Sequence, residues 1–132
     1  MNNSELRQIV EEQKAELALF KESEMVPREK VPDINTDSNL AQIITGIRRS
    51  GKSTLALQAL LDKHYAYINF DDERFINFQA DKLNDLLEAL YTVYGDFEYL
   101  LLDEIQNVEG WHLFVNRLLR NKIRIVLTGS NS

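Results

Sequence analysis

The chain has 132 residues and a formal net charge of −6 at pH 7, with 44% hydrophobic and 27% charged residues. This composition is that of a globular protein and not of a disordered or fibrous one. The length allows one compact domain with a hydrophobic core, but not two. The negative charge argues against nonspecific binding of duplex DNA over the whole surface, because contacts to phosphates require clustered lysine and arginine.

The rare residue types exclude further classes of site. The chain contains no cysteine and two histidines, so disulfides and thiolate metal sites are excluded, and a zinc site would need several carboxylates. The N-terminal segment is acidic where a signal peptide is basic and then apolar, and no stretch approaches the roughly 20 apolar residues of a membrane span. We therefore expect a cytoplasmic protein that does not contact a membrane.

The N-terminal part has the pattern of an amphipathic helix. Residues 1–24 carry apolar side chains at helical spacing, and Ser4 is the predicted N-cap. The following segment, 25–39, contains two prolines and many turn-forming residues, so we interpret it as a linker. Because the helix needs a surface to lie on, it is our candidate for contact with a protein partner or for homo-oligomerisation.

Beyond the linker, residues 40–132 alternate between strand-like and helix-like segments. This alternation is typical of βαβ units that form a parallel sheet covered by helices on both faces. We predict an α/β fold in three layers, with about four parallel strands flanked by helices. The predicted strands are 41–45, 65–70, 99–102 and 123–128.

A phosphate-binding loop follows the first predicted strand. Residues 46–53 match the pattern G-x-x-x-x-G-K-[ST] and stand between a strand and a helix, as a P-loop requires. We expect Lys52 to reach the β- and γ-phosphates of a nucleotide and Ser53 to place its hydroxyl on the bridging magnesium, while Thr54 supports the helix start. The side chains of Arg48 and Arg49 vary freely in this pattern, and we expect them to face solvent. The predicted nucleotide-binding residues are Gly46, Ile47, Arg48, Arg49, Ser50, Gly51, Lys52, Ser53 and Thr54.

Two carboxylates stand where the third predicted strand ends. Asp103 and Glu104 would lie at the carboxyl edge of the sheet, where open α/β sheets bind ligands. Asp103 is expected to hold magnesium through a water molecule, and Glu104 to orient or deprotonate the attacking water. An acidic pair can also simply end a strand and begin a turn. The upstream P-loop favours the nucleotide interpretation, and the adjacent Glu104 favours hydrolysis over transfer to another acceptor by a kinase.

The fourth predicted strand ends in a polar segment that starts at Thr128. If this strand lies between the first and the third, a γ-phosphate sensor would follow it; Asn131 is our choice and Ser130 the alternative. The same residues are also typical of a loop or a frayed terminus. The predicted catalytic residues are therefore Lys52, Glu104 and Asn131.

Several segments together resemble the bacterial and archaeal AAA-type predicted ATPases. The most specific are the Gly-x-Arg-Arg-x-Gly-Lys form of the P-loop and the Asp-Glu-Ile-Gln sequence at 103–106. The resemblance implies ATP and magnesium as ligands. Full-length relatives continue with a fifth strand, a helical lid and a nuclease-like domain. This chain therefore resembles their N-terminal part, truncated before the fifth strand, with its first strand left as a sheet edge.

These observations lead to one expected function and one alternative. We expect binding of Mg-ATP, with hydrolysis that belongs to the full-length context and is weak in this chain alone. The alternative is a nucleotide-gated interaction module that binds ATP without turnover. A GTPase is disfavoured because no Asn-Lys-x-Asp motif is present. Nucleic acid would be a partner only of the full-length protein, since the cluster Arg117, Arg120, Lys122 and Arg124 is explained by the dipole of the preceding helix.

Overall fold

The computed structural model describes residues 1–23, 35, 37–46 and 52–130. Most of the predicted linker, the loop residues Ile47, Arg48, Arg49, Ser50 and Gly51, and the predicted sensor Asn131 lie outside the described residues. The strand that precedes the loop, the helix that follows it and the acidic strand end are all described.

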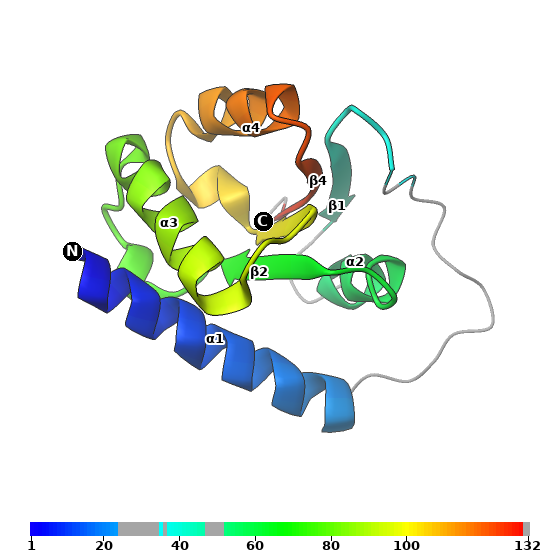
Figure 1. Ribbon diagram of the computed structural model, residues 1–132, viewed down its shortest axis with the longest axis horizontal. Helices are drawn as coiled ribbons and strands as arrows, with labels where there is room; N and C mark the ends of the chain where they lie inside the picture. The colour runs from blue at the N-terminus through cyan, green and yellow to red at the C-terminus, as the bar shows by residue number, and fades with distance from the viewer. Residues whose placement is uncertain (24–34, 36, 47–51, 131–132) are drawn as a thin grey trace.

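The centre of the molecule is a parallel sheet of four strands (Figure 1). The strands are β1 (Gln42–Gly46), β2 (Tyr65–Asn69), β3 (Tyr99–Asp103) and β4 (Arg124–Ser130). Their order across the sheet is β1-β4-β3-β2, and each neighbouring pair is parallel. This confirms the predicted parallel sheet, and it places β4 between β1 and β3.

Helices cover both faces of this sheet, as predicted. They are α1 (Asn3–Ser23), α2 (Lys52–Ala59), α3 (Leu83–Tyr94) and α4 (Trp111–Arg120), with 3-10 turns at Glu73–Phe75, Ala80–Lys82 and Ile105–Asn107. One apolar cluster joins α3, α4 and the first half of α1 to one face of the sheet. A second cluster joins α2 and the second half of α1 to the other face. The sheet is therefore the middle of three layers.

Helix α1 crosses from one face to the other at the outer edge of β2. Its early apolar residues, such as Ile9, belong to the cluster with α3, whereas Leu17 belongs to the cluster with α2. Figure 1 shows α1 running along this side of the molecule. The apolar face predicted for a partner surface is thus largely buried within the chain itself: Leu6, Ile9, Val10 and Leu17 are each exposed by 8% or less.

Gln13 stands at the crossing point and pairs with the edge of the sheet. Its side-chain amide donates to the carbonyl oxygen of Asn69 at 3.0 Å and accepts from the N–H of Asn69 at 2.8 Å. An edge strand presents unpaired backbone groups of this kind to any neighbouring chain. Gln13, which is only 4% exposed, thus takes the place that a further strand would occupy beside β2.

The start of α1 differs from the prediction. The side chain of Asn2, not that of Ser4, accepts a hydrogen bond from the N–H of Glu5, at 2.9 Å. The Glu5 carboxylate accepts in return from the N–H of Asn2 at 3.4 Å. This is a capping box, which needs an acidic residue three positions after the cap. Asn2 has Glu5 at that position, whereas the residue three positions after Ser4 is Arg7.

The opposite edge of the described sheet is open. Strand β1 pairs with β4 and with no other described strand. Ile43 on this strand is 59% exposed, and Leu40 just before it is 72% exposed. The two edges therefore differ, because α1 covers β2 while no described strand pairs with the outer edge of β1.

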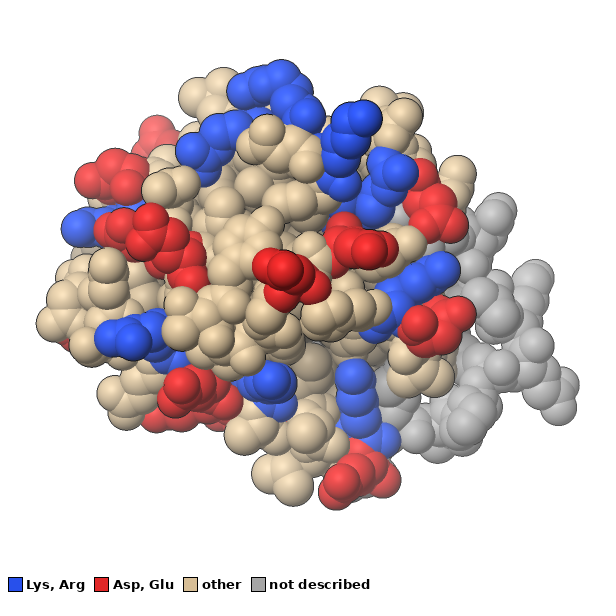
Figure 2. Space-filling model, viewed as in Figure 1, with Lys and Arg blue, Asp and Glu red and all other residues tan. Residues whose placement is uncertain are grey.

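Charge is mixed over the surface that Figure 2 shows. Lysine and arginine side chains gather at the top of this view, over α4, while acidic side chains lie among basic ones elsewhere. Helix α4 carries Arg117 and Arg120 in its last turn, where cations interact favourably with the helix dipole. Among the described residues, no helix is long and apolar enough to cross a membrane.

We predict that Gln13→Ala destabilises the protein by about 1–3 kcal/mol, because it leaves the backbone N–H and C=O of Asn69 without their partner. Urea unfolding measures this loss. The matched control is Gln8→Ala on the same helix, where the glutamine makes an exposed hydrogen bond to Glu12. The control should change the free energy of unfolding by less than about 0.5 kcal/mol. Equal losses in the two variants would contradict the role of Gln13 at the sheet edge.

Candidate functional site

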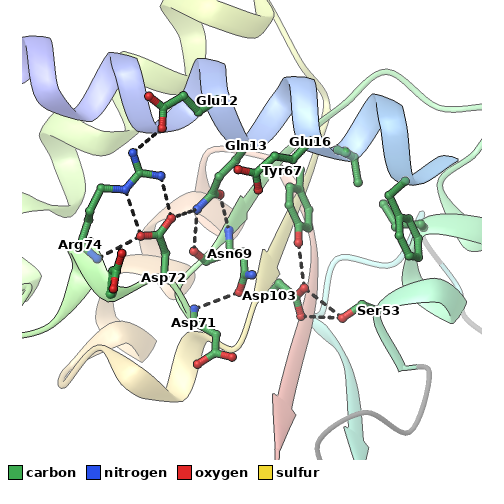
Figure 3. Close-up of a pocket in the computed structure, with 14 residues that line it drawn as sticks. Glu12, Gln13, Glu16, Ser53, Tyr67, Asn69, Asp71, Asp72, Arg74 and Asp103 are labelled. Atoms are coloured by element: carbon green, nitrogen blue, oxygen red, sulfur yellow. Dashed lines mark hydrogen bonds and ion pairs between the residues drawn. The ribbon is translucent and has the colours of Figure 1, made fainter. Parts of the chain in front are cut away.

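The P-loop helix and the acidic strand end meet at the carboxyl edge of the sheet. Ser53 is the second residue of α2, and Asp103 is the last residue of β3. The Ser53 hydroxyl lies 3.0 Å from Oδ1 and 2.9 Å from Oδ2 of Asp103 (Figure 3). The two residues predicted to hold magnesium are therefore in direct contact, although they are far apart in sequence.

Asp103 is buried and receives hydrogen bonds from further hydroxyl groups. Its side chain belongs to a residue that is only 4% exposed. The Tyr67 hydroxyl, on β2, donates to Oδ2 at 2.9 Å, and the Thr128 hydroxyl, on β4, donates to Oδ1. Burial, and next the negative charge of Asp103, raise the pKa of Tyr67, so its hydroxyl stays protonated and donates. Donors from α2, β2 and β4 thus converge on one carboxylate.

Glu104 is held by a different set of groups. Its backbone adopts the left-handed conformation with φ 57° and ψ 44°, which is unfavourable for a residue with a side chain. Its carboxylate accepts from the Ser130 hydroxyl at 2.6 and 2.8 Å and from the Gln106 amide at 3.0 Å. The sharp turn after β3 therefore separates the two carboxylates, and Glu104 is bonded to the end of β4.

Thr128 connects these two carboxylate environments. It is fully buried, and its hydroxyl accepts from the N–H of Glu104 at 3.0 Å while it donates to Asp103. The sequence alone does not identify Thr128 or Tyr67 as site residues, because threonine and tyrosine are common in strands. Alternation along each strand shows which residues share a face. It shows which residues of different strands lie close together only once the order of the strands is known.

For the other predicted site residues, the structure describes some and leaves others outside the described part of the chain. Gly46 ends β1 and Lys52 begins α2, as the P-loop pattern requires. Thr54 follows Ser53 in the first turn of α2 and is half-buried. Ser130, the alternative sensor, contacts Glu104. Asn131 and residues 47–51 lie outside the described part of the chain.

A cleft of about 1010 Å³ lies between α1 and the Ser53–Asp103 pair. Figure 3 shows α1 above it, with Glu12, Gln13 and Glu16 on the helix side. Ligand pockets of proteins reach a similar volume. The loop after β2 also lines the cleft, and in it Arg74 forms ion pairs with both Glu12 and Asp72. The pair with Glu12 ties the loop to α1 at the rim of the cleft, and the pair with Asp72 lies within the loop.

The donor set at Ser53 and Asp103 fits magnesium, which prefers hard oxygen ligands and usually takes only one or two from the protein. Among the described residues, no group of three or more His, Cys, Asp or Glu side chains could hold a metal ion.

Comparison with known proteins identifies related sequences. A family model described as "AAA domain" matches residues 38–132. An uncharacterized protein of Methanocaldococcus jannaschii is 37% identical over 120 residues, which cover 88% of this chain and 26% of the relative. An uncharacterized protein of Haemophilus influenzae is 33% identical over 106 residues, covering 73% of this chain and 26% of the relative. The chain thus spans about a quarter of the length of these relatives, and no solved structure matches it.

We predict that the ion pairs at the cleft rim make stability depend on pH below about 4. The hydrogen bonds from Arg74 lower the pKa of Asp72 to about 2, so the folded protein binds this proton less readily than the unfolded chain. The stabilisation is therefore complete above the unfolded value and is lost as the pH falls towards about 2. Thermal unfolding of Asp72→Asn should show a lower melting temperature than wild type at neutral pH and a shrinking difference in acid.

The variant Asp96→Asn controls for the removal of one negative charge, because Asp96 is exposed in the loop before β3. A difference in melting temperature between wild type and Asp72→Asn that stays constant down to about pH 2 would contradict this account of Asp72.

Proposed function

We propose that this chain, which belongs to the AAA domain family, binds ATP together with magnesium between the start of α2 and the end of β3. The observation that carries the proposal is the contact between Ser53 and Asp103. It joins the end of a sequence that matches the P-loop pattern to a buried carboxylate at the carboxyl edge of a parallel sheet. Neither residue needs to move far to share one cation.

The roles of the residues follow from this arrangement. We assign the phosphates to the backbone of residues 46–51 and to the N-terminus of α2, whose N–H groups and dipole favour an anion. Lys52 contacts the β- and γ-phosphates, and Thr54 supports the helix start. Ser53 and Asp103 hold the magnesium, which neutralises phosphate charge.

Hydrolysis is the second part of the proposal, and we assign it to a protein of the length of the relatives, of which this chain spans about a quarter. Glu104 is the proposed base, because it follows the metal-binding carboxylate directly and is positioned by Ser130. Asn131 or Ser130 would sense the γ-phosphate. In P-loop enzymes, groups such as arginine fingers add large factors to the rate.

One observation favours the alternative, an interaction module that binds ATP without turnover. Both oxygens of the Glu104 carboxylate accept hydrogen bonds from Ser130, and one also accepts from Gln106. These hydrogen bonds occupy part of the acceptor capacity of the carboxylate, which leaves fewer lone pairs for an attacking water. The two functions share the same binding site and differ in whether Glu104 accepts a proton from water.

We predict that ATP with magnesium raises the melting temperature of the chain, and that Lys52→Ala removes this shift. Ligand that binds only the folded state stabilises it by about 2.7 kcal/mol at a concentration 100 times the dissociation constant. ADP and GTP should be measured beside ATP to define the base and the phosphate requirement. Lys82→Ala removes the same charge from an exposed ion pair with Asp85 and should keep the full shift. No shift with wild type, or an equal shift with Lys52→Ala, would refute the proposed site.

We predict that Glu104→Gln retains ATP binding and loses hydrolysis, because glutamine keeps the shape of the side chain and cannot accept a proton. A general base contributes about 10²- to 10⁴-fold to a rate, so phosphate release under single-turnover conditions should fall by at least about 100-fold. Unchanged hydrolysis in the variant would remove Glu104 from the mechanism. Hydrolysis is measured on a protein of the length of the relatives, and tight binding by its wild-type form with no phosphate release would instead support the interaction module.

A further inference from the structure

The hydroxyl of Tyr67 is the least expected of the groups that contact Asp103. It comes from β2, which contributes nothing to the P-loop or to the acidic strand end. We propose that Tyr67 is a positioning residue that orients the Asp103 carboxylate for magnesium, an inference that rests on the proposed function. Its hydroxyl makes the affinity for Mg-ATP, and not the affinity for ATP alone, depend on β2.

The strand register explains how Tyr67 reaches Asp103. In the parallel pairing of β2 with β3, Tyr67 stands opposite Leu101, and Asn69 stands opposite Asp103. Residues two apart on a strand share one face, so Tyr67 and Asp103 lie diagonally on the same face of the sheet. A diagonal neighbour is within reach of an aromatic side chain, and here the hydroxyl lies 2.9 Å from Oδ2.

The Tyr67 ring is fixed by its surroundings. Tyr67 is 9% exposed and belongs to the apolar cluster of α2 and the second half of α1, which includes Leu57 and Leu17. Figure 3 shows the ring descending from the α1 side of the cleft towards Asp103. A phenol held in this way positions its hydroxyl at little cost in entropy, because packing has already fixed the side chain.

Two of the three donors around Asp103 hold one oxygen each. Thr128 donates to Oδ1 and Tyr67 donates to Oδ2, while Ser53 faces both oxygens. An aspartate carboxylate otherwise rotates easily, because its last torsion is broad. With one lone pair on each oxygen occupied by Thr128 or Tyr67, the lone pairs that remain are those facing Ser53, where the proposed cation binds.

Tyr65 provides an internal comparison for Tyr67. It lies two residues earlier on β2, shares the same face and the same apolar cluster, and is 8% exposed. Its hydroxyl is buried and has no hydrogen-bond partner in the described structure. The two tyrosines therefore differ in the one feature that the proposal concerns, which is the bond to Asp103.

The experiment measures ATP binding by calorimetry as a function of free magnesium, for wild type, Tyr67→Phe and Tyr65→Phe. Loss of a group that orients a metal ligand typically lowers metal affinity by about 10- to 100-fold. Tyr67→Phe should therefore need at least about ten times more magnesium for half-maximal ATP binding. ATP binding in EDTA should be the same in all three proteins, and Tyr65→Phe should match wild type throughout.

A double-mutant cycle tests whether Tyr67 acts through Asp103. In an Asp103→Asn background, Tyr67→Phe should cause no further change in the magnesium dependence. An additional loss in that background would overturn the proposed route. Thermal melts of each variant establish that the protein measured is folded.

Two outcomes of the calorimetry also overturn the inference and are distinct from failure of the proposed function. Tyr67→Phe with the magnesium dependence of wild type would show that its hydroxyl does not orient the metal ligand. An equal loss of ATP binding with and without magnesium would show a general structural role. If wild type itself binds no nucleotide, the proposed function fails, and the role of Tyr67 fails with it.

Discussion

A buried carboxylate must be supplied with hydrogen-bond donors, and the architecture around Asp103 follows from this requirement. An ionised group removed from water costs several kcal/mol unless charge-assisted hydrogen bonds compensate. Asp103 obtains its donors from Ser53, Tyr67 and Thr128, which belong to three different elements. These donors meet only if β2, β3 and β4 are adjacent and parallel and α2 begins at the same edge. The need to supply Asp103 with hydrogen-bond donors therefore constrains both the strand order and the candidate site.

Much of this arrangement could be predicted from local sequence. Short apolar strands, helical stripes and the spacing of the P-loop are local patterns, and they predicted the parallel sheet and the approach of Ser53 to Asp103. The contributions of Tyr67 and Thr128 could not be predicted in the same way. Each is a typical strand residue, and its role depends on the register with a strand that is distant in sequence.

The N-terminal helix shows the same limit. Its amphipathic pattern predicts the helix correctly, but the prediction of Ser4 as the cap is wrong. Asn2 is the cap, because its side chain and backbone pair with Glu5. Gln13 is indistinguishable in sequence from the solvent-facing polar residues around it. It is buried because the backbone of Asn69 supplies its partners, and those partners exist only where β2 ends the sheet. The apolar face of an amphipathic helix can thus be buried against its own domain and does not by itself indicate a partner protein.

The two edges of the described sheet differ in whether a further strand can pair with them. On the β2 side, Gln13 and α1 occupy the backbone groups that another strand would need. On the β1 side, the described sheet offers a free backbone edge with Ile43 exposed. A strand added from elsewhere must therefore dock against β1, the strand that leads into the P-loop. Such a strand would lie beside the residues that lead into the P-loop pattern, so extension of the sheet and the proposed nucleotide site would meet at one strand.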